Sequence, residues 1–270
     1  NLPMATIQDW HLLEKSKPVI YRRFVLNSWD EDDITSQCID PQRVNKAIGR
    51  HLFNQPPYYR IIGVDIARKG DDKTVAYAME NGNILDRLEL EKRDTMKTVG
   101  HLLIFAKKNK GIENFAIDEL NAGAGVVDRL TELGKNVIAV NSARKSNSPE
   151  KYRNIRAEVW GWGSEQFELD RLSLPKDDLD LLEQLKWSEW KAIESSGVLQ
   201  VELKEDIIKR YGRSPDNADA YLYGLWGMQF IQPVGISGEQ RKVVNYFVNP
   251  MWDASTKRDR GQYDRLARLS

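Results

Sequence analysis

The stretch Ile61-Ile62-Gly63-Val64-Asp65 decides the fold, because it is an apolar run that ends abruptly on a carboxylate. Phe115-Ala116-Ile117-Asp118-Glu119 repeats the pattern, and Ser214-Pro215-Asp216-Asn217-Ala218-Asp219-Ala220 places two carboxylates at the start of an amphipathic helix. Apolar runs of this kind fill strands that are buried on both faces. A carboxylate at the end of such a strand loses hydration, and a divalent cation offsets that cost for several acids at once. The three stretches therefore predict a metal site.

The residues around the first stretch predict an antiparallel meander. Residues 59–66 form the first expected strand, and residues 74–79 and 84–90 form the next two. The last two flank Asn81-Gly82-Asn83, a turn signal that is typical of a tight hairpin. The three segments are therefore expected to form adjacent antiparallel strands.

Beyond residue 94 the pattern changes to alternating helices and strands. Apolar residues recur at helical spacing over 95–108, and the strand that ends at Asp118 follows. A helix through Val126, Leu130 and Leu133 comes next, and then a strand over 137–140. Such alternation indicates parallel strands with helices packed on them. Further helices are expected over 150–168, 177–186 and 214–230, with a second hairpin formed by 187–193 and 198–203.

These elements predict an α/β protein with a mixed central sheet, an antiparallel three-strand meander plus parallel strands, flanked by helices. A meander, then alternating helices and strands, then a closing helix that supplies acids is the layout of the ribonuclease-H-like fold. Pro56-Pro57 predicts a boundary, since each proline removes a backbone donor and restricts its own φ. The expected divisions are 1–57, a sheet domain over 58–232, and a basic tail over 233–270.

Composition limits the possible functions. The chain of 270 residues is 41% hydrophobic and 30% charged, which is typical of a globular protein. Forty Lys and Arg balance forty Asp and Glu, so contact with a polyanion must use local basic patches. The single cysteine, Cys38, excludes an intramolecular disulfide and a cysteine-based zinc site. No apolar run approaches the roughly 20 residues of a membrane span, and the chain is interpreted as cytosolic.

The acids at the ends of these elements are candidate catalytic residues and metal ligands. Phosphodiester cleavage in a two-metal site needs carboxylates that hold two ions roughly 3.5–4 Å apart. Hard oxygen ligands favour Mg²⁺ or Mn²⁺. Asp65 and Asp118 end neighbouring strands, and Asp118 is preferred over Glu119 because adjacent strand residues point to opposite faces. Asp216 and Asp219 share one helix face at a spacing of three residues.

Ordinary structural roles remain as alternatives for these acids. An acid at a strand end can cap a nearby turn. Ser214 can cap the closing helix while Pro215 starts it, and acids are common in the first turn of a helix. Capping accounts for one acid of this helix and leaves the second, on the same face, unexplained.

Several cations near the acids are candidate contacts for a DNA backbone. Arg68, Lys69 and Lys73 lie in the loop that follows the first strand, and a glycine within that loop permits close approach. Lys204 and Arg213 precede the acidic helix. The alternative for each of them is an ordinary solvated charge on the surface.

A string of short motifs runs through the sheet domain from about residue 59 to 228. It consists of Gly63-Val64-Asp65, Asp72-Lys73-Thr74, Ile117-Asp118, Gly123-Ala124-Gly125-Val126-Val127-Asp128-Arg129-Leu130, Asn154-Ile155-Arg156-Ala157-Glu158, Leu174-Pro175, Val201-Glu202-Leu203-Lys204 and Arg213-Ser214-Pro215-Asp216-Asn217-Ala218-Asp219-Ala220. In this order the motifs resemble the nuclease domain of large terminase subunits from tailed bacteriophages. The ordered string is far more specific than any one motif.

The resemblance implies a metal-dependent endonuclease that cuts concatemeric viral double-stranded DNA during genome packaging, using two Mg²⁺ or Mn²⁺ ions. Asp65, Asp118 and Asp219 would bind the ions, and Asp216 takes a position where the family varies. Large terminases also carry a packaging ATPase. Because no GxxxxGK[ST] phosphate loop occurs here, the chain is expected to be a C-terminal fragment in which 1–57 are the end of the ATPase region and a linker.

The same resemblance implies a terminase small subunit and a portal protein as partners in the full motor, no membrane, and action in the host cell cytoplasm. The isolated fragment is expected to be monomeric. A junction resolvase or transposase-like nuclease of the same fold is an alternative, and it would prefer branched or end-specific DNA. An actin-like ATPase or sugar kinase needs a second glycine-rich phosphate loop and an adenosine-binding glycine pair, and neither occurs. A non-catalytic DNA-binding remnant would leave the acids without a role.

Overall fold

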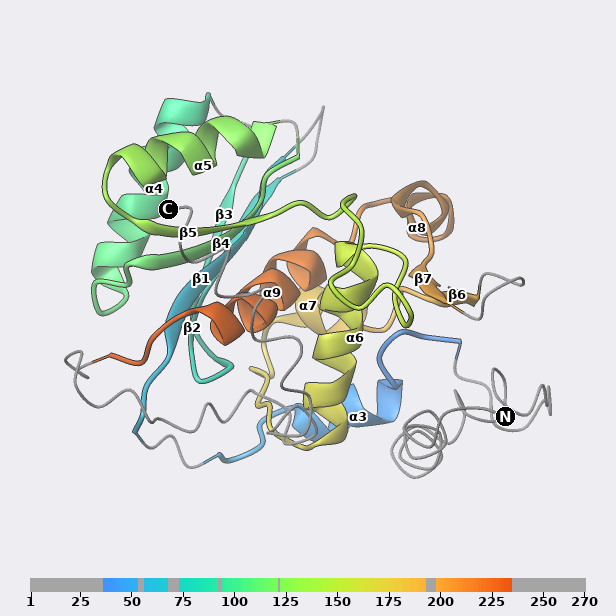
Figure 1. Cartoon of the computed structure of the whole chain (residues 1–270). Helices are drawn as coiled ribbons and strands as arrows, with labels where there is room; N and C mark the ends of the chain where they lie inside the picture. The colour runs from blue at the N-terminus through green and yellow to red at the C-terminus, as the bar shows by residue number, and fades with distance from the viewer. Residues whose placement is uncertain are drawn as a thin grey trace, which may run out of the picture.

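The computed structural model describes residues 36–52, 56–67, 73–91, 94–120, 122–192 and 198–234. Its elements are, in chain order, α3 (Pro41–Ala47), β1 (Arg60–Asp65), β2 (Thr74–Glu80), β3 (Asn83–Leu90), α4 (Thr95–Lys108), β4 (Asn114–Asp118), α5 (Ala122–Glu132), β5 (Asn136–Val140), α6 (Ile155–Glu168), α7 (Leu179–Gln184), β6 (Trp190–Ala192), β7 (Leu199–Val201), α8 (Lys204–Tyr211), α9 (Asp216–Gly227) and the 3-10 helix η2 (Met228–Phe230) (Figure 1). Within these ranges, no helix has the length and apolar character needed to cross a membrane.

Five strands form one mixed sheet in the order β3-β2-β1-β4-β5. β2 pairs antiparallel with both β1 and β3, while β4 runs parallel to both β1 and β5. The turn between β2 and β3 places Asn81 and Gly82 at φ 51° and 80°, a left-handed conformation that asparagine and glycine tolerate. The predicted meander and parallel strands are confirmed, and the arrangement is that of the ribonuclease-H-like fold.

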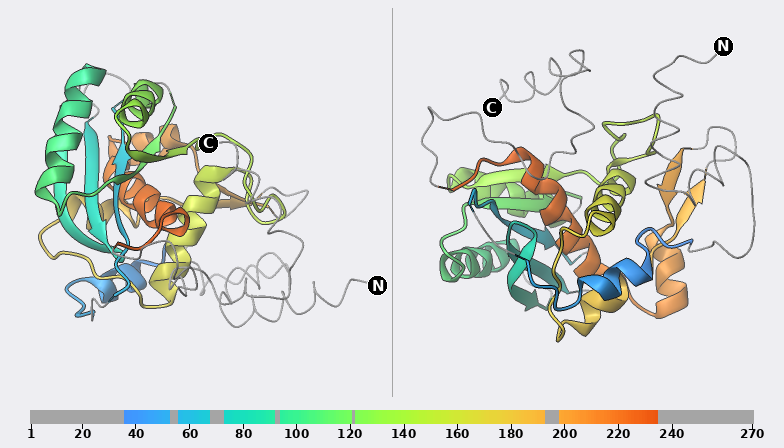
Figure 2. Two further views of the ribbon diagram at one scale, coloured as in Figure 1. Left: turned by 60° about the vertical axis from the view of Figure 1, so that its left-hand side comes forward. Right: turned by 90° about the horizontal axis from the view of Figure 1, so that it is seen from below.

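The strands turn alternate side chains toward two different helical layers. On one face Ile62 and Val64 of β1 share a hydrophobic cluster with side chains of α4 and α5, including Leu102. On the other face Ile61 shares a cluster with side chains of α6 and α9. Figure 2 shows α4 on one side of the sheet, with α9 and then α6 on the other. The alternation places Asp65, like Ile61, on the face that α9 covers.

Helix α9 lies directly against β1 at a glycine. A Cβ atom added at Gly63 would lie 2.2 Å from the carbonyl oxygen of Ala220 and 2.6 Å from the backbone nitrogen of Gly224. No residue larger than glycine fits at this approach without a shift of the backbone. Because the helix crosses the strand here, the first turn of α9 lies beside the end of β1.

Several element ends differ from the predicted ones. α6 begins at Ile155 and not at residue 150, because the side chain of Asn154 accepts a hydrogen bond from the backbone N–H of Ala157 and caps the helix there. α9 begins at Asp216 with Pro215 in the N-cap position, and the N-cap residue makes no side-chain cap hydrogen bond, so the interpretation of Ser214 as the cap is wrong. Helices α3 and α8 fall outside the elements that the sequence predicts.

The segment that precedes Pro56-Pro57 packs into the same core as the sheet domain. Val44 and Ala47 of α3 belong to the hydrophobic cluster beneath α9, and the backbone N–H of Cys38 donates to the carbonyl of Ser188 at 2.7 Å. Residues 36–52 thus share a core with the elements that follow residue 57, and the division of the chain at this position stays a prediction. Residues 1–35 and nearly all of the predicted tail over 233–270 lie outside the described residues.

Candidate active site

The four predicted acids come from three elements that meet at one edge of the sheet. Asp65 ends β1 and Asp118 ends β4, and both are buried. Because β1 and β4 are parallel neighbours, their carboxyl ends lie at the same edge. Asp216 and Asp219 occupy the first turn of α9, beside the end of β1. The structure thus brings together acids that are more than 150 positions apart in the chain.

The ammonium of Lys204, the first residue of α8, lies among three of these carboxylates. Its Nζ is 2.8 Å from Oδ2 of Asp219, 3.2 Å from Oδ2 of Asp65 and 4.0 Å from Oδ1 of Asp216. Burial opposes the charged ammonium, but these acids outweigh it and raise the pKa of Lys204 above its usual value. Lys204 is therefore a resident cation of the cluster, and a DNA contact by this residue stays a prediction.

The pKa values of Asp65 and Asp219 are shifted in opposite directions by their surroundings. Burial raises the pKa of Asp65 well above its usual range, and the charges of Asp216, Asp219 and Asp118 add to this effect although Lys204 opposes it. For Asp219 burial acts in the same direction, but the nearby cations and a hydrogen bond from Trp160 prevail and lower its pKa. The ionised form of Asp219 is thus stabilised by the groups around it. The ionised form of Asp65 is destabilised, and an additional cation nearby would stabilise it.

Residues that the sequence analysis did not assign to the site hold these carboxylates in place. Trp160 is fully buried, and its Nε1 donates to Oδ1 of Asp219 at 2.9 Å. The hydroxyl of Tyr223 donates to Oδ2 of Asp118 at 3.4 Å. A spacing of four residues separates Asp219 from Tyr223 on α9, so helical periodicity is the signal that links them.

Arg156 of α6 is a second buried cation beside the cluster. Its Nε lies 3.9 Å from Oδ1 of Asp219, and its Nη1 donates to the carbonyl of Glu202 at 2.6 Å. Among the described residues, its Nε and Nη2 atoms are buried without a hydrogen-bond partner. The guanidinium therefore acts on Asp219 mainly through its charge, and it also anchors the chain two residues before Lys204.

The first turn of α9 is capped by a side chain from another helix. Oε1 of Gln184, the last residue of α7, accepts hydrogen bonds from the backbone N–H groups of Asn217 at 2.7 Å and Ala218 at 3.3 Å. The hydroxyl of Tyr77 on β2 donates to Oδ1 of Asn217 at 3.0 Å. Tertiary contacts thus replace the local cap and fix the turn that carries two of the acids.

Three of the remaining predicted residues, Glu119, Lys73 and Arg213, have partners outside this cluster. Glu119 accepts a hydrogen bond from Nδ2 of Asn141 at 2.7 Å. Lys73 forms an ion pair with Glu89. Arg213 forms an ion pair with Asp180 at 2.7 Å and lies over the ring of Trp187. Arg68 and Lys69 lie outside the described residues.

The donor set of the cluster fits a hard divalent cation. Carboxylate oxygens are the ligands that Mg²⁺ and Mn²⁺ prefer, and the acids already surround one positive charge. In the described part of the chain no three His, Cys, Asp or Glu side chains are arranged to hold a metal ion as they stand. The ammonium of Lys204 lies between three of the carboxylates.

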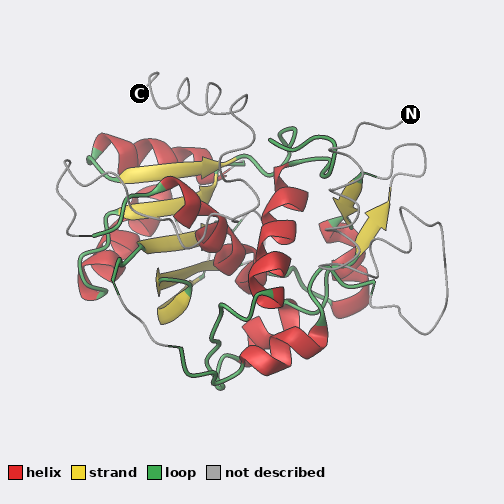
Figure 3. Ribbon diagram, turned by 60° about the horizontal axis from the view of Figure 1, so that its bottom comes forward, coloured by secondary structure: helices red, strands yellow, loops and turns green. Residues whose placement is uncertain are grey.

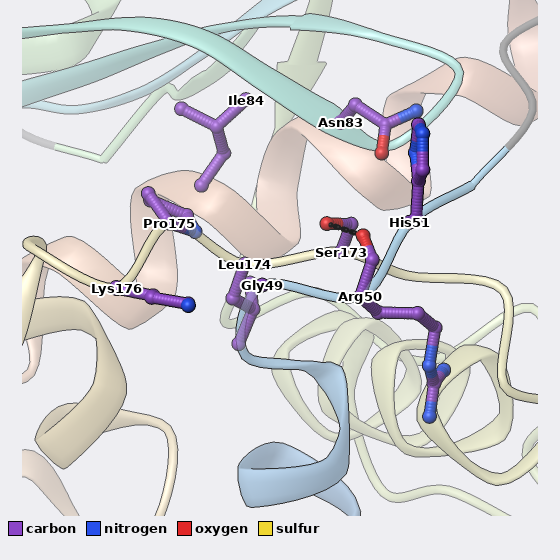
Figure 4. A pocket seen from close by; sticks show the side chains of 9 residues that line it. All are labelled: Gly49, Arg50, His51, Asn83, Ile84, Ser173, Leu174, Pro175 and Lys176. Carbon is purple, nitrogen blue, oxygen red and sulfur yellow. Dashed lines mark hydrogen bonds between the residues drawn. The ribbon is translucent and has the colours of Figure 1, made fainter.

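A shallow pocket of about 300 Å³ lies elsewhere, at the other end of the meander (Figure 4). It is lined by residues from the β2–β3 turn, including Asn83, and by His51 and Lys176. Arg50 turns its guanidinium away from the pocket and pairs with Asp170 at 2.7 Å. Since no acid lines this pocket, it is separate from the carboxylate cluster.

The fold and the buried carboxylates define an α/β domain of the ribonuclease-H-like class with a negatively charged site at the sheet edge. No family model and no curated protein matches the chain. Among solved structures, it is similar to the nuclease domain of the large terminase subunit gp2 of bacterial virus Sf6, at 18% identity and a TM-score of 0.57, over 69% of this chain and 96% of that one. A mutant of that domain, solved with manganese and beta-thujaplicinol, matches at 18% identity and a TM-score of 0.58, with the same coverage of each chain.

The large terminase nuclease from thermophilic phage G20c, solved with bound magnesium, matches at 16% identity and a TM-score of 0.52 over 71% of this chain and 97% of that one. In each comparison the match covers nearly the whole length of the solved nuclease domain. The chain therefore has the fold of large terminase nuclease domains.

Proposed function

We propose that the chain is a metal-dependent endonuclease that cuts concatemeric viral double-stranded DNA during genome packaging. The observation that carries the proposal is the cluster of three buried acids, Asp65, Asp118 and Asp219, with the partly buried Asp216 beside them, at one edge of a ribonuclease-H-like sheet. Such acids destabilise a fold unless cations compensate them. The structural similarity to terminase nuclease domains that were solved with manganese and magnesium also supports a metal-dependent nuclease.

The side chains of the cluster would have different roles in the reaction. Two bound Mg²⁺ or Mn²⁺ ions would supply the activation of water and the stabilisation of the leaving oxygen. Asp65, Asp118 and Asp219 would hold the ions, with Asp216 as a further oxygen donor. Trp160 orients the carboxylate of Asp219. Lys204 keeps the acids together without metal, because its charge offsets their mutual repulsion.

The setting of this activity is part of the proposal. The chain would act in the host cell cytoplasm as the nuclease portion of a packaging motor, with 1–57 as the end of the ATPase region and linker, 58–232 as the nuclease domain, and 233–270 as a basic tail. Its partners would be the terminase small subunit and the portal protein. The isolated chain would be monomeric.

Metal-dependent cleavage of plasmid DNA tests the proposal. The chain is expected to nick and linearise supercoiled plasmid with Mn²⁺ or Mg²⁺, and EDTA is expected to stop the reaction because it removes the ions. Gel analysis of supercoiled, nicked and linear forms over a range of salt measures this. A folded chain that cuts nothing under these conditions contradicts the proposal. Strong preference for a four-way junction over linear duplex would favour a resolvase instead.

Removing the resident ammonium is expected to strengthen metal binding. In Lys204→Met the carboxylates lose the ammonium that lies between them, so we expect the dissociation constant for Mn²⁺ to fall by at least about tenfold. Titration calorimetry measures this, and Mn²⁺ should also raise the unfolding temperature of the variant more than that of the wild type. Lys209→Met is the matched control, because Lys209 lies on the same helix and pairs with Asp206 at the surface. Unchanged or weaker Mn²⁺ binding in Lys204→Met would show that the ammonium does not compete with metal.

A further inference from the structure

The geometry points to residues 141–154 as a rigid cationic arm that holds the backbone of double-stranded DNA beside the carboxylate cluster, through Arg144, Lys145 and Arg153. The inference rests on the proposed nuclease function and names the part of the surface that binds its substrate. The arm connects β5 to α6, and Figures 1 and 3 show it running from the edge of the sheet to the start of that helix.

Both ends of the arm adjoin the acids. Val140, the last residue of β5, pairs with Asp118, and the arm begins at the next residue. At the other end, Arg156 follows three residues after Arg153 and reaches Asp219. The backbone N–H of Arg153 also donates to the carbonyl of Leu199 on β7, which leads into Lys204. A polyanion bound along the arm therefore lies next to the candidate site.

The arm is held in a defined shape, which lowers the entropic cost of binding. Glu158 of α6 accepts hydrogen bonds from the Ser146 hydroxyl at 2.7 Å and from the backbone and side-chain nitrogens of Asn147 at 2.7 and 3.0 Å. The backbone N–H of Ile155 donates to the carbonyl of Arg144 at 2.8 Å. Lys145 and Asn154 form a β-bridge. The cations thus project from a backbone that is tied to α6 on both sides.

The charges of the arm remain available to a ligand. Arg144, Lys145 and Arg153 are exposed, and none of them forms an ion pair within the described residues, whereas Lys151 of the same segment pairs with Glu165 at 2.8 Å. By contrast, the sequence-predicted cations Lys73, Lys204 and Arg213 are all engaged by acids. A cation that is already paired gives up that pair when it binds a phosphate, so the unpaired arm is the better phosphate contact.

Salt-dependent binding of a labelled duplex tests the arm. Fluorescence anisotropy is measured in EDTA, so that no cleavage occurs, over about 50–200 mM salt. In the variant Arg144→Ala/Lys145→Ala/Arg153→Ala we expect the slope of log affinity against log salt to become shallower by about two to three, and affinity near 0.1 M salt to fall on the order of 100-fold. With Mn²⁺ present, KM for DNA should rise while kcat changes little, because the carboxylates are untouched.

Two control variants distinguish a specific contribution of the arm from the effect of removing any surface cations. Lys46→Ala/Lys97→Ala/Lys107→Ala removes three exposed cations of α3 and α4 that form no ion pair with any described residue, and it should leave the slope unchanged. Arg144→Lys/Arg153→Lys keeps the charges and should retain the wild-type slope. Equal loss in the arm and control variants, or wild-type binding by the arm variant, overturns the inference while leaving cleavage by the wild type intact. Wild-type protein that binds duplex through the arm but never cuts it contradicts the nuclease proposal instead.

Discussion

Asp65→Asn is expected to slow Mn²⁺-dependent DNA cleavage by about 1000-fold or more, equivalent to about 4 kcal/mol of transition-state stabilisation. Asparagine has nearly the same shape as aspartate, but it lacks the negative charge and offers a metal only one oxygen. The effect should be large because Asp65 is 3% exposed, ends the strand at the centre of the cluster, and lies near every other acid of the group. Initial rates of plasmid nicking at saturating Mn²⁺ measure it.

Glu119→Gln is the matched control for Asp65→Asn. It neutralises a carboxylate that follows Asp118 directly but bonds to Asn141 away from the cluster, so its cleavage rate should stay within about threefold of wild type. Thermal unfolding should show that both variants fold. If Asp65→Asn retains a tenth of the wild-type rate, the assignment of Asp65 as a metal ligand is wrong.

Gly63→Ala is expected to destabilise the protein by about 3 kcal/mol, lowering the unfolding temperature by about 6–12 °C. Intrinsic propensity alone predicts the opposite sign, since alanine in a strand is preferred over glycine by about 0.5–1 kcal/mol. The added methyl would lie 2.2 Å from the carbonyl oxygen of Ala220. Because this oxygen belongs to the backbone of α9, the clash is relieved only if α9 moves away from β1. Because α9 carries Asp216 and Asp219, Mn²⁺ binding should weaken as well. Thermal and denaturant unfolding, with Mn²⁺ titration, measure both effects.

Gly100→Ala gives the contrasting control. Gly100 lies inside α4, and a Cβ atom added there meets nothing within 4 Å. Alanine should therefore stabilise the protein by about 0.5–1 kcal/mol through its helix propensity. A Gly63→Ala protein that is as stable as the wild type would show that the contact between β1 and α9 is looser than described.

Much of the fold is predictable because apolar residues recur along the chain with the spacing of buried strands and helices. The apolar run that ends at Asp65 correctly predicts a strand buried on both faces, with Ile61 in one cluster and Ile62 in the other, and the Asn81-Gly82 turn correctly predicts the hairpin. The same two-residue period favours Asp118 over Glu119, and the structure turns Asp118 toward Tyr223 of α9. Element ends are less predictable, as with α9, whose first turn is capped by Gln184 of another helix.

The sequence by itself thus determined the sheet, its helical layers and the acids at its edge, because hydrophobic periods and chain order are local properties. Only the tertiary structure decided which cations meet those acids. Lys204 is 139 positions from Asp65, and nothing in its local pattern separates it from a surface lysine. In the same way, folding paired Lys73 and Arg213 with acids, whereas Arg144, Lys145 and Arg153 form no ion pair in the described part of the chain. The energy of a charge depends on burial and on neighbours a few ångströms away, which come from distant parts of the chain.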